Sequence, residues 1–299
     1  MPARRSEGMP WWPLVDGRKP WRREKSIWHD AGMSTAGVAQ LVALGFDAND
    51  PSRLAGFWAE ALGWSVGDEA GGEVPVVPTD GTRFQLVFRS AQVQKAGRNR
   101  IHLDLTTVSL DDQQRLVATL LELGGRHVDV GQRSDEGHVV LSDPEGNEFC
   151  VIEPGNRFLA GCGRLGAINC DGTRRVGYFW SQTLGWPLVW DQDEETAIRA
   201  PDGTGPLITW SGPPLIPKFG MNRLRLDLAP AADDDDRADA DDRPAGDRRA
   251  DVDRDPTVDR LVSLGATVVD DHGGDTGCVV MADPDDNEFC VLTAPIADR

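Results

Sequence analysis

The sequence contains little that would suit a membrane or an oxidising compartment. No stretch approaches the roughly 18–20 consecutive apolar residues that a membrane-spanning helix needs, and the N-terminus lacks the apolar segment of a secretory signal. The five cysteines are an odd number, and no CxxC pair occurs. Neither a disulfide framework nor a zinc ribbon is therefore indicated, and we expect free thiols, a cytoplasmic location and no membrane partner.

Positive charge is also scarce. The chain has 31 Lys and Arg against 49 Asp and Glu, which gives a net charge of −18. Such a surface repels phosphate backbones, so we expect no nucleic-acid partner. Much of the negative charge lies in residues 231–256, which contain no aromatic residue and, as their single large aliphatic side chain, Val252. We predict an acidic disordered insert there, because it cannot bury enough surface to offset its ordering entropy. A tether for a cation or partner is the alternative.

The first 36 residues form a second unusual segment. They are basic, rich in proline and tryptophan, and without a hydrophobic period. We predict a disordered tail outside the fold. Because Met33 precedes a stretch that resembles a natural start, a mis-started N-terminus is a further hypothesis.

Several short stretches occur twice, in the same order. "DPEGNEFCV" begins at Asp143 and "DPDDNEFCV" at Asp283. "FWAEALGW" likewise returns as "FWSQTLGW", and "NRIHLDL" as "NRLRLDL". Their separation lengthens only across the acidic segment, so we infer a tandem duplication of a module of about 115 residues with an insert in the second copy. The predicted boundaries are 37–155 for module 1, 156–163 for a linker and 164–294 for module 2.

Each module shows a helix followed by short strands, twice over. In module 1, "AQLVALGFD" has strand length, Asp50 and Pro51 suit a helix start, and Gly63 suits its end. Three short β-type pieces follow, and the pattern then restarts. Each module is therefore predicted to be βαβββ–βαβββ, an α+β fold with helices on one sheet face. We expect each module to curve its own sheet around a cavity.

These features resemble the vicinal oxygen chelate superfamily, which includes glyoxalase I, extradiol dioxygenases and bleomycin resistance proteins. The resemblance rests on "FWAEALGW" after a capped helix, "HLDL" in the fifth strand and "DPEGNEFCV" at the eighth. It is nearest to the glyoxalase-like branch and covers both modules. It implies eight strands forming a half-barrel around a pocket. It also implies that the two modules pair internally, so that the chain is a pseudo-dimer and a monomer.

The resemblance places metal ligands on the first, fifth and eighth strands of a module. In module 1 only His102, on the fifth strand, retains a family ligand, because Cys150 occupies the eighth-strand position and Val42–Ala43 the first. In module 2 the matching residues are Arg225 and Cys290. No triad is complete, so the resemblance implies no assured metal cofactor, although a divalent metal stays possible.

Strand alternation then selects the side chains that share a face. His102 and Asp104 point the same way, as do Glu148 and Cys150, while Ile101 and Leu103 point towards the helices. The candidate ligand-binding residues are Gln85, His102, Asp104, Cys150, Arg225, Asp227 and Cys290. The candidate catalytic residues are His102, Glu148 and Cys150.

Three functions are compatible with this set. We favour a small-molecule binder with its principal pocket on the concave face of module 1, with Trp64, Trp186, Trp190 and Trp210 as stacking candidates. The first alternative is a metal-dependent lyase, isomerase or dioxygenase. The second is metal-free acid–base chemistry, with His102 as the base and Cys150 as a candidate nucleophile.

Overall fold

A computed structural model describes residues 37–92, 94–132, 136–231, 256–270 and 277–292. The predicted N-terminal tail lies outside these residues, and so does nearly all of the predicted acidic insert. Both remain predictions.

The order of helices and strands confirms the predicted pattern. The first unit contains β1 (Ala39–Ala48), α1 (Pro51–Leu62), β2 (Ser65–Val66), β3 (Glu73–Val77) and β4 (Gln85–Ser90). The second contains β5 (Ile101–Leu105), α2 (Leu110–Glu122), β6 (Arg126–His127), β7 (Val139–Ser142) and β8 (Glu148–Val151). Module 2 repeats this with β9 (Leu165–Cys170), α3 (Arg174–Leu184), β10 (Leu188–Gln192), β11 (Glu195–Ile198) and β12 (Leu207–Trp210). Its last unit contains β13 (Leu224–Pro230), α4 (Pro256–Leu264), β14 (Thr267–Asp270), β15 (Cys278–Ala282) and β16 (Glu288–Leu292).

Local chemistry sets the bounds of α1 as the sequence predicts. The carboxylate of Asp50 accepts a hydrogen bond from the backbone N–H of Arg53, and Pro51 occupies the first turn. Gly63 ends the helix in the left-handed region at φ 69°, where glycine has no steric penalty. The buried side of the helix includes Trp58, which packs edge-on against Phe149 of β8. None of the described helices is both long enough and apolar enough to cross a membrane.

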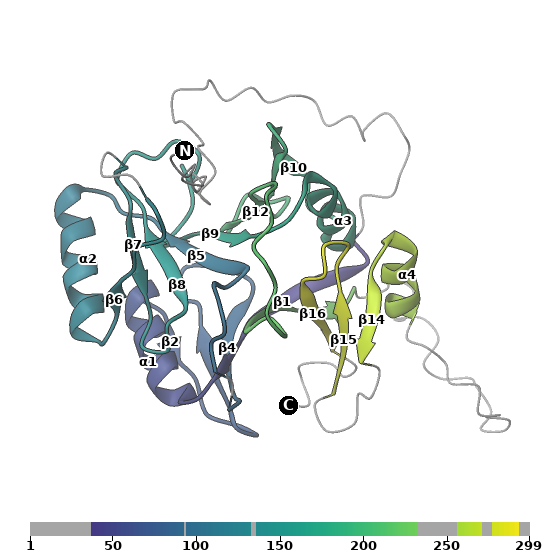
Figure 1. Cartoon of the computed structure of the whole chain (residues 1–299), viewed down its shortest axis with the longest axis horizontal. Coiled ribbons are helices and arrows are strands. Elements are labelled where there is room, and N and C mark those ends of the chain that lie inside the picture. Colours follow the sequence, from purple (N-terminus) through teal and green to yellow (C-terminus); the bar gives the residue numbers. More distant parts are fainter. Residues whose placement is uncertain (1–36, 93, 133–135, 232–255, 271–276, 293–299) are drawn as a thin grey trace, which may run out of the picture.

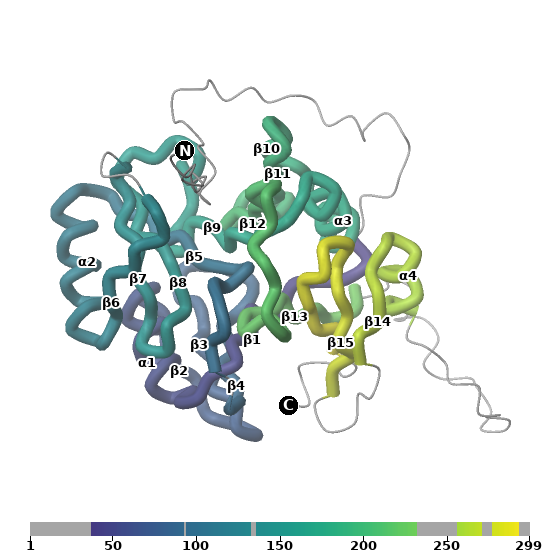
Figure 2. Tube along the Cα trace, in the orientation of Figure 1, coloured from purple at the N-terminus to yellow at the C-terminus, as the bar shows by residue number. Residues whose placement is uncertain are grey.

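Each sheet, however, contains strands from both modules. Sheet A joins β1–β4 to β13–β16, and sheet B joins β5–β8 to β9–β12, with eight strands in each. The joins are antiparallel, between β1 and β13 in sheet A and between β5 and β9 in sheet B. Figures 1 and 2 show the two modules side by side, α1 and α2 with one and α3 and α4 with the other, while the strands run on between them. The expectation that each module curves its own sheet is therefore wrong: the modules exchange half-sheets.

One face of each sheet forms the main core with the helices. Ile101, Leu103 and Leu105 of β5 belong to it, as predicted from alternation, together with aromatic side chains of α1 and α3. A second, smaller apolar cluster lies on the opposite face of sheet B, and it includes Cys150, Ala167 and Leu207. The predicted linker adds Leu159 to this cluster, so it covers that face.

Hydrogen bonds to the repeated nonapeptides stabilise this arrangement. Asp143 accepts a hydrogen bond from the indole N–H of Trp58 at 3.1 Å, and Asp283 accepts one from Trp180 at 3.2 Å. Both turns are thus tied to the first helix of their own module. Burial raises the pKa of Asp143 and that of Asp283 to about 6, against the opposing effect of these donors.

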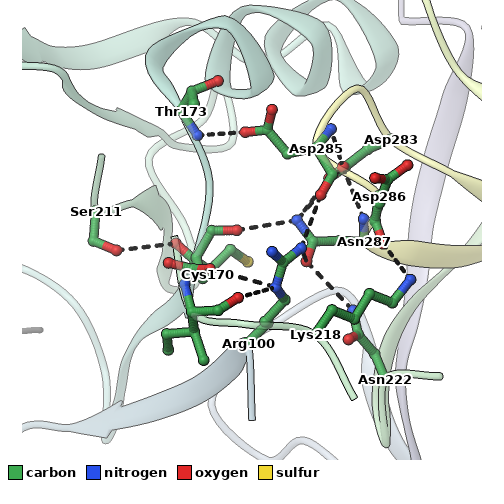
Figure 3. A network of polar contacts seen from close by, with 12 residues as sticks. Arg100, Cys170, Thr173, Ser211, Lys218, Asn222, Asp283, Asp285, Asp286 and Asn287 are labelled. Atoms are coloured by element: carbon green, nitrogen blue, oxygen red, sulfur yellow. Dashed lines mark hydrogen bonds and ion pairs between the residues drawn. The ribbon is translucent and has the colours of Figure 1, made fainter. Parts of the chain in front are cut away.

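The same turns also join the modules. Arg223 of module 2 donates to the carbonyl oxygen of Glu145, and Arg100 of module 1 donates to that of Asp285. Figure 3 shows Arg100 at the centre of this contact, where it also reaches the side-chain oxygen of Asn287 at 3.2 Å. The duplication therefore preserves a reciprocal contact across the molecule.

Candidate functional site

The exchange of half-sheets creates two equivalent faces away from the main core. We call the first the B face: His102 and Asp104 of β5, Cys150 of β8, Asn169 of β9 and Thr209 of β12. In the strand register, Asp104 lies opposite Cys150, His102 lies opposite Asn169, and Asn169 lies opposite Thr209. The structure thus brings three predicted residues of module 1 together with two residues of module 2.

The second is the A face: Gly45 of β1, Gln85 and Arg89 of β4, Arg225 and Asp227 of β13, and Cys290 of β16. Four of the predicted ligand-binding residues lie here, namely Gln85, Arg225, Asp227 and Cys290. The expectation that Gln85 joins His102 is wrong, because β4 belongs to sheet A and β5 to sheet B. Thr209 of module 2 lies opposite Asn169 on the B face.

Ion pairs fill the A face. The guanidinium of Arg89 donates to the buried carboxylate of Asp227 at 2.7 Å and to Glu73 at 2.8 Å. It passes so close to Gly45 that a Cβ there would lie 2.2 Å from its Nη1 atom. Burial raises the pKa of Asp227, and the Arg89 guanidinium opposes that rise. Arg225, a candidate ligand-binding residue, donates instead to the carboxylate of Asp47.

The sulfur of Cys290 is not available as a thiol. Cys290 forms a disulfide with Cys278 of the neighbouring strand, which corrects the expectation that cysteines of this chain are free. Cys150, Cys162 and Cys170 are free, and Cys150 is fully buried.

Glu148 has a counterpart that explains its position. Its carboxylate accepts from Lys95 at 2.7 Å and from the backbone N–H of Asn99 at 3.2 Å. In module 2, Glu288 accepts in the same way from the N–H of Asn222 and pairs with Lys218. Because both copies share this contact, we interpret it as structural. The signal was present in the sequence as "KAGRN" and "KFGMN", which place a lysine four residues before the asparagine.

Burial sets the protonation of the B face. It lowers the pKa of His102 to about 3, and the nearby His138 adds to that effect. It raises the pKa of Asp104 well above its usual value, opposed only by a hydrogen bond from Asn169. It raises the pKa of the Cys150 thiol as well, and the neighbouring carboxyls of Asp104 and Glu136 add to this. Imidazole and thiol are therefore neutral near pH 7 in the absence of a ligand, and burial favours the neutral form of the carboxyl.

A cavity of about 30 Å³ lies against the B face, larger than the roughly 10–15 Å³ that one water occupies. Both modules and the linker contribute to its wall: Asp104, Asn156, Phe158, Leu159, Asn169, Trp190, Glu195, Thr196, Thr209 and Trp210. Of the tryptophans proposed as stacking surfaces, Trp190 and Trp210 line the cavity. Trp64 instead donates its N–H to Asp80, and Trp186 packs on the main core.

Several polar atoms in this wall have no hydrogen-bond partner among the described residues. They are Asp104 Oδ1, Asn169 Oδ1, Trp190 Nε1, Thr196 Oγ1 and Thr209 Oγ1. Each belongs to a residue with at most 9% of its surface exposed. An unsatisfied buried polar group costs about 1–3 kcal/mol, so the presence of several such atoms in one cavity wall calls for a physical explanation.

The same face also offers donor atoms for a metal ion. One atom each of His102, Asp104 and Cys150 lie within 4.8 Å of one another. Nitrogen, carboxylate oxygen and thiolate sulfur are all zinc ligands, and three protein ligands with one open position are usual for catalytic zinc. The donor set therefore fits a divalent metal in kind. Binding must release the proton of the buried thiol, whose pKa is raised, so it requires a higher pH than an exposed site would.

Comparison with known proteins identifies the architecture. The model of the glyoxalase-like domain matches residues 43–152 and, a second time, residues 167–292. Glyoxalase I from Zea mays is similar over 85% of this chain and 92% of that chain, with a TM-score of 0.54 and 14% identity. A putative dioxygenase from Bacillus subtilis is similar over 87% of each chain, with a TM-score of 0.54 and 13% identity. A search of curated proteins found no match. At these identities the solved structures support the fold alone.

Proposed function

Because the chain belongs to the glyoxalase-like domain family, we propose that it binds a small molecule in the cavity of the B face. This pocket does not belong to module 1 alone. Module 1 supplies Asp104, module 2 supplies Asn169 and Thr209, and the linker covers them. The duplicated chain thus builds one composite pocket from both of its copies.

One observation carries the proposal: buried polar atoms converge on the cavity without partners. Asp104 Oδ1, Asn169 Oδ1 and Thr209 Oγ1 point to a ligand that supplies the missing hydrogen bonds. Phe158 and Trp190, whose ring centroids are 5.8 Å apart, add an aromatic wall. Polar groups that meet aromatic side chains in one pocket are characteristic of a small-molecule site.

The protonation of the B face favours binding over acid–base catalysis. A histidine with a pKa of about 3 is a weak base at neutral pH, whereas an efficient general base has a pKa near the working pH. Cys150 with a raised pKa is a protonated, unreactive thiol.

A panel of small neutral, anionic and cationic compounds tests the proposal on the full chain. A compound at 100 times its Kd should raise the unfolding free energy by about 2.7 kcal/mol. Thr209→Val removes a hydroxyl and keeps the shape, so it should weaken the effect. Ser263→Ala, at an exposed hydroxyl of α4, should leave it unchanged. A panel in which no compound depends on Thr209 would overturn the proposal.

A metal-dependent function is the second candidate, favoured by the clustering of His102, Asp104 and Cys150. A metal held by these three residues would polarise an oxygen atom of a substrate as a Lewis acid. Equilibrium dialysis against Zn²⁺, followed by elemental analysis, is the test, with proton release on binding as an independent measurement. His102→Ala should abolish stoichiometric zinc and Cys162→Ser should not. Zinc binding that is indifferent to His102 contradicts this candidate.

A further inference from the structure

The duplication allows the A face and the B face to be compared position by position. Asp104 in "HLDL" corresponds to Asp227 in "RLDL". Ala167 lies opposite Asp104 as Ala43 lies opposite Asp227, so Asn169 on β9 corresponds to Gly45 on β1. The β4 register against β1 and the β12 register against β9 then place Ser211 where the A face has Arg89.

On the A face, this set of positions forms a filled site. The guanidinium of Arg89 lies in the space left by Gly45 and donates to the carboxylate of Asp227 at 2.7 Å. The chain thus supplies its own cation to the buried aspartate.

On the B face, the cation is missing. Ser211 is too short to reach Asp104 and donates instead to the carbonyl oxygen of Cys170. The equivalent region is the cavity. Asp104 Oδ1 lies 3.5 Å from Nε2 of the His102 imidazole, which is neutral near pH 7, and it accepts no hydrogen bond from the described residues. A buried carboxyl with the geometry of Asp227 therefore faces a void where its twin faces a guanidinium.

The rest of the cavity wall suits a donor of hydrogen bonds. It contains two carboxyl groups, those of Asp104 and Glu195, and no lysine or arginine. Asn169 Oδ1 adds an acceptor without a hydrogen-bond partner, and the hydroxyl of Thr209 can accept as well. Phe158 and Trp190 offer aromatic surfaces, which attract cations in addition to apolar groups.

We propose that the ligand of the B face carries an amidinium or guanidinium group on an apolar or aromatic body. Its N–H groups donate to Asp104 as those of Arg89 donate to Asp227, and its body lies against Phe158 and Trp190. This inference rests on the proposed function and specifies its ligand class. The linker residues Asn156, Phe158 and Leu159 cover the cavity, so they must move outward to admit a body larger than the cation.

Three matched probes test the charge requirement: benzamidine, benzamide and benzoate, which are cationic, neutral and anionic forms of one shape. Calorimetric titration of the full chain, in EDTA to exclude metal bridging, should give benzamidine at least tenfold tighter binding than benzamide. That is about 1.4 kcal/mol, as expected of a charge-assisted hydrogen bond. Benzoate should not bind measurably.

Variants locate the effect and guard against misfolding. The substitution Asp104→Asn should reduce the affinity for benzamidine to that for benzamide. The double variant Asn169→Gly/Ser211→Arg rebuilds the arrangement of the A face, so its own guanidinium should displace benzamidine. Its control, Asn169→Gly/Ser211→Ala, leaves the space open and should still bind benzamidine. An unchanged circular dichroism spectrum establishes that each variant folds.

The outcomes separate this inference from the proposed function. If benzamide or another neutral or anionic compound binds at least as tightly, in a Thr209-dependent way, the cationic ligand is wrong and the pocket stands. If benzamidine binds equally well to Asp104→Asn, the role of Asp104 is wrong. If no compound of any class binds, both fail.

Discussion

The A face and the B face occupy equivalent positions in the duplicated fold. A side chain of the protein fills the A face, whereas the B face contains a cavity. On the A face, Arg89 neutralises the buried Asp227, and the sulfur of Cys290 is held in a disulfide. On the B face, Asp104 has no cationic partner, Cys150 is a free thiol, and a cavity remains. The difference shows that one long side chain of the protein can fill a duplicated site. This requires a glycine on the strand beside that side chain.

Removing that side chain should produce the largest effect. In Arg89→Met the carboxyl of Asp227 stays buried without its cation, and losing one partner of a buried pair costs about 3–5 kcal/mol. Because the Arg89 side chain is 22% exposed, we expect a loss of about 3 kcal/mol, at the lower end of that range. Urea unfolding measures it.

The matched substitution on the other face is Asp104→Asn, which breaks no ion pair with a cation. It should not lower the unfolding free energy at pH 7 by more than about 1 kcal/mol. Similar losses in the two variants would abolish the distinction between a filled and an open face.

The disulfide should have the next largest effect. Cys278 and Cys290 are 12 residues apart, and closing a loop of that size stabilises a fold by about 3 kcal/mol in the chain-entropy model. Cys278→Ala should lower the urea midpoint accordingly, whereas Cys162→Ala, at a free thiol, should lower it much less. Titration of the unfolded, unreduced chain should find three thiols, those of Cys150, Cys162 and Cys170. A count of five would contradict the disulfide.

The pH dependence of stability should come from Asp104 in a defined direction. Its pKa in the folded chain is raised above the usual 3.8, so above pH 3.8 the folded chain holds a proton that the unfolded chain has lost. The unfolding free energy therefore falls as the pH rises through this window. The Asp104→Asn variant has no titratable group at this position. Its unfolding free energy should therefore rise, relative to that of the wild type, by at most about 1.4 kcal/mol per pH unit. Unfolding curves from pH 5 to 8 measure the gain, and a constant difference would refute it.

The smallest effect concerns the two repeated turns. Asp286 has φ 65° where its counterpart Gly146 has φ 87°. Asp tolerates this region at a modest cost, so Asp286→Gly should stabilise by about 0.5 kcal/mol. Gly146→Asp should destabilise by a similar amount. A difference in unfolding free energy of the same sign in both variants would contradict the equivalence of the turns.

Local features of the fold could be predicted from sequence because their causes are local. The caps of α1 at Asp50 and Gly63 depend on neighbouring residues, and alternation along β5 places His102 with Asp104 whatever the strand pairs with. The strand partners could not be predicted in this way. The same alternation fits β5 paired within its own module or with β9, and only distant contacts such as that of Arg100 with Asp285 decide between them.

The candidate site was predicted only in its module 1 half. His102, Asp104 and Cys150 follow from one module, whereas Asn169 and Thr209 enter the B face through the exchange of half-sheets. The disulfide escaped prediction because two cysteines on neighbouring strands of a hairpin leave no short motif. The filling of the A face could have been suspected from Arg89 standing where module 2 has Ser211.

The linker, residues 156–163, is where the chain can be severed between the two modules without cutting a strand. The protein can be produced as two pieces, one ending before residues 156–163 and one starting after them. Each piece would expose two unpaired edge strands: β1 and β5 in the first piece, and β9 and β13 in the second. These edge strands pair with each other in the whole chain, so the two pieces should reassemble when mixed. Either piece alone should dimerise through its edge strands or aggregate.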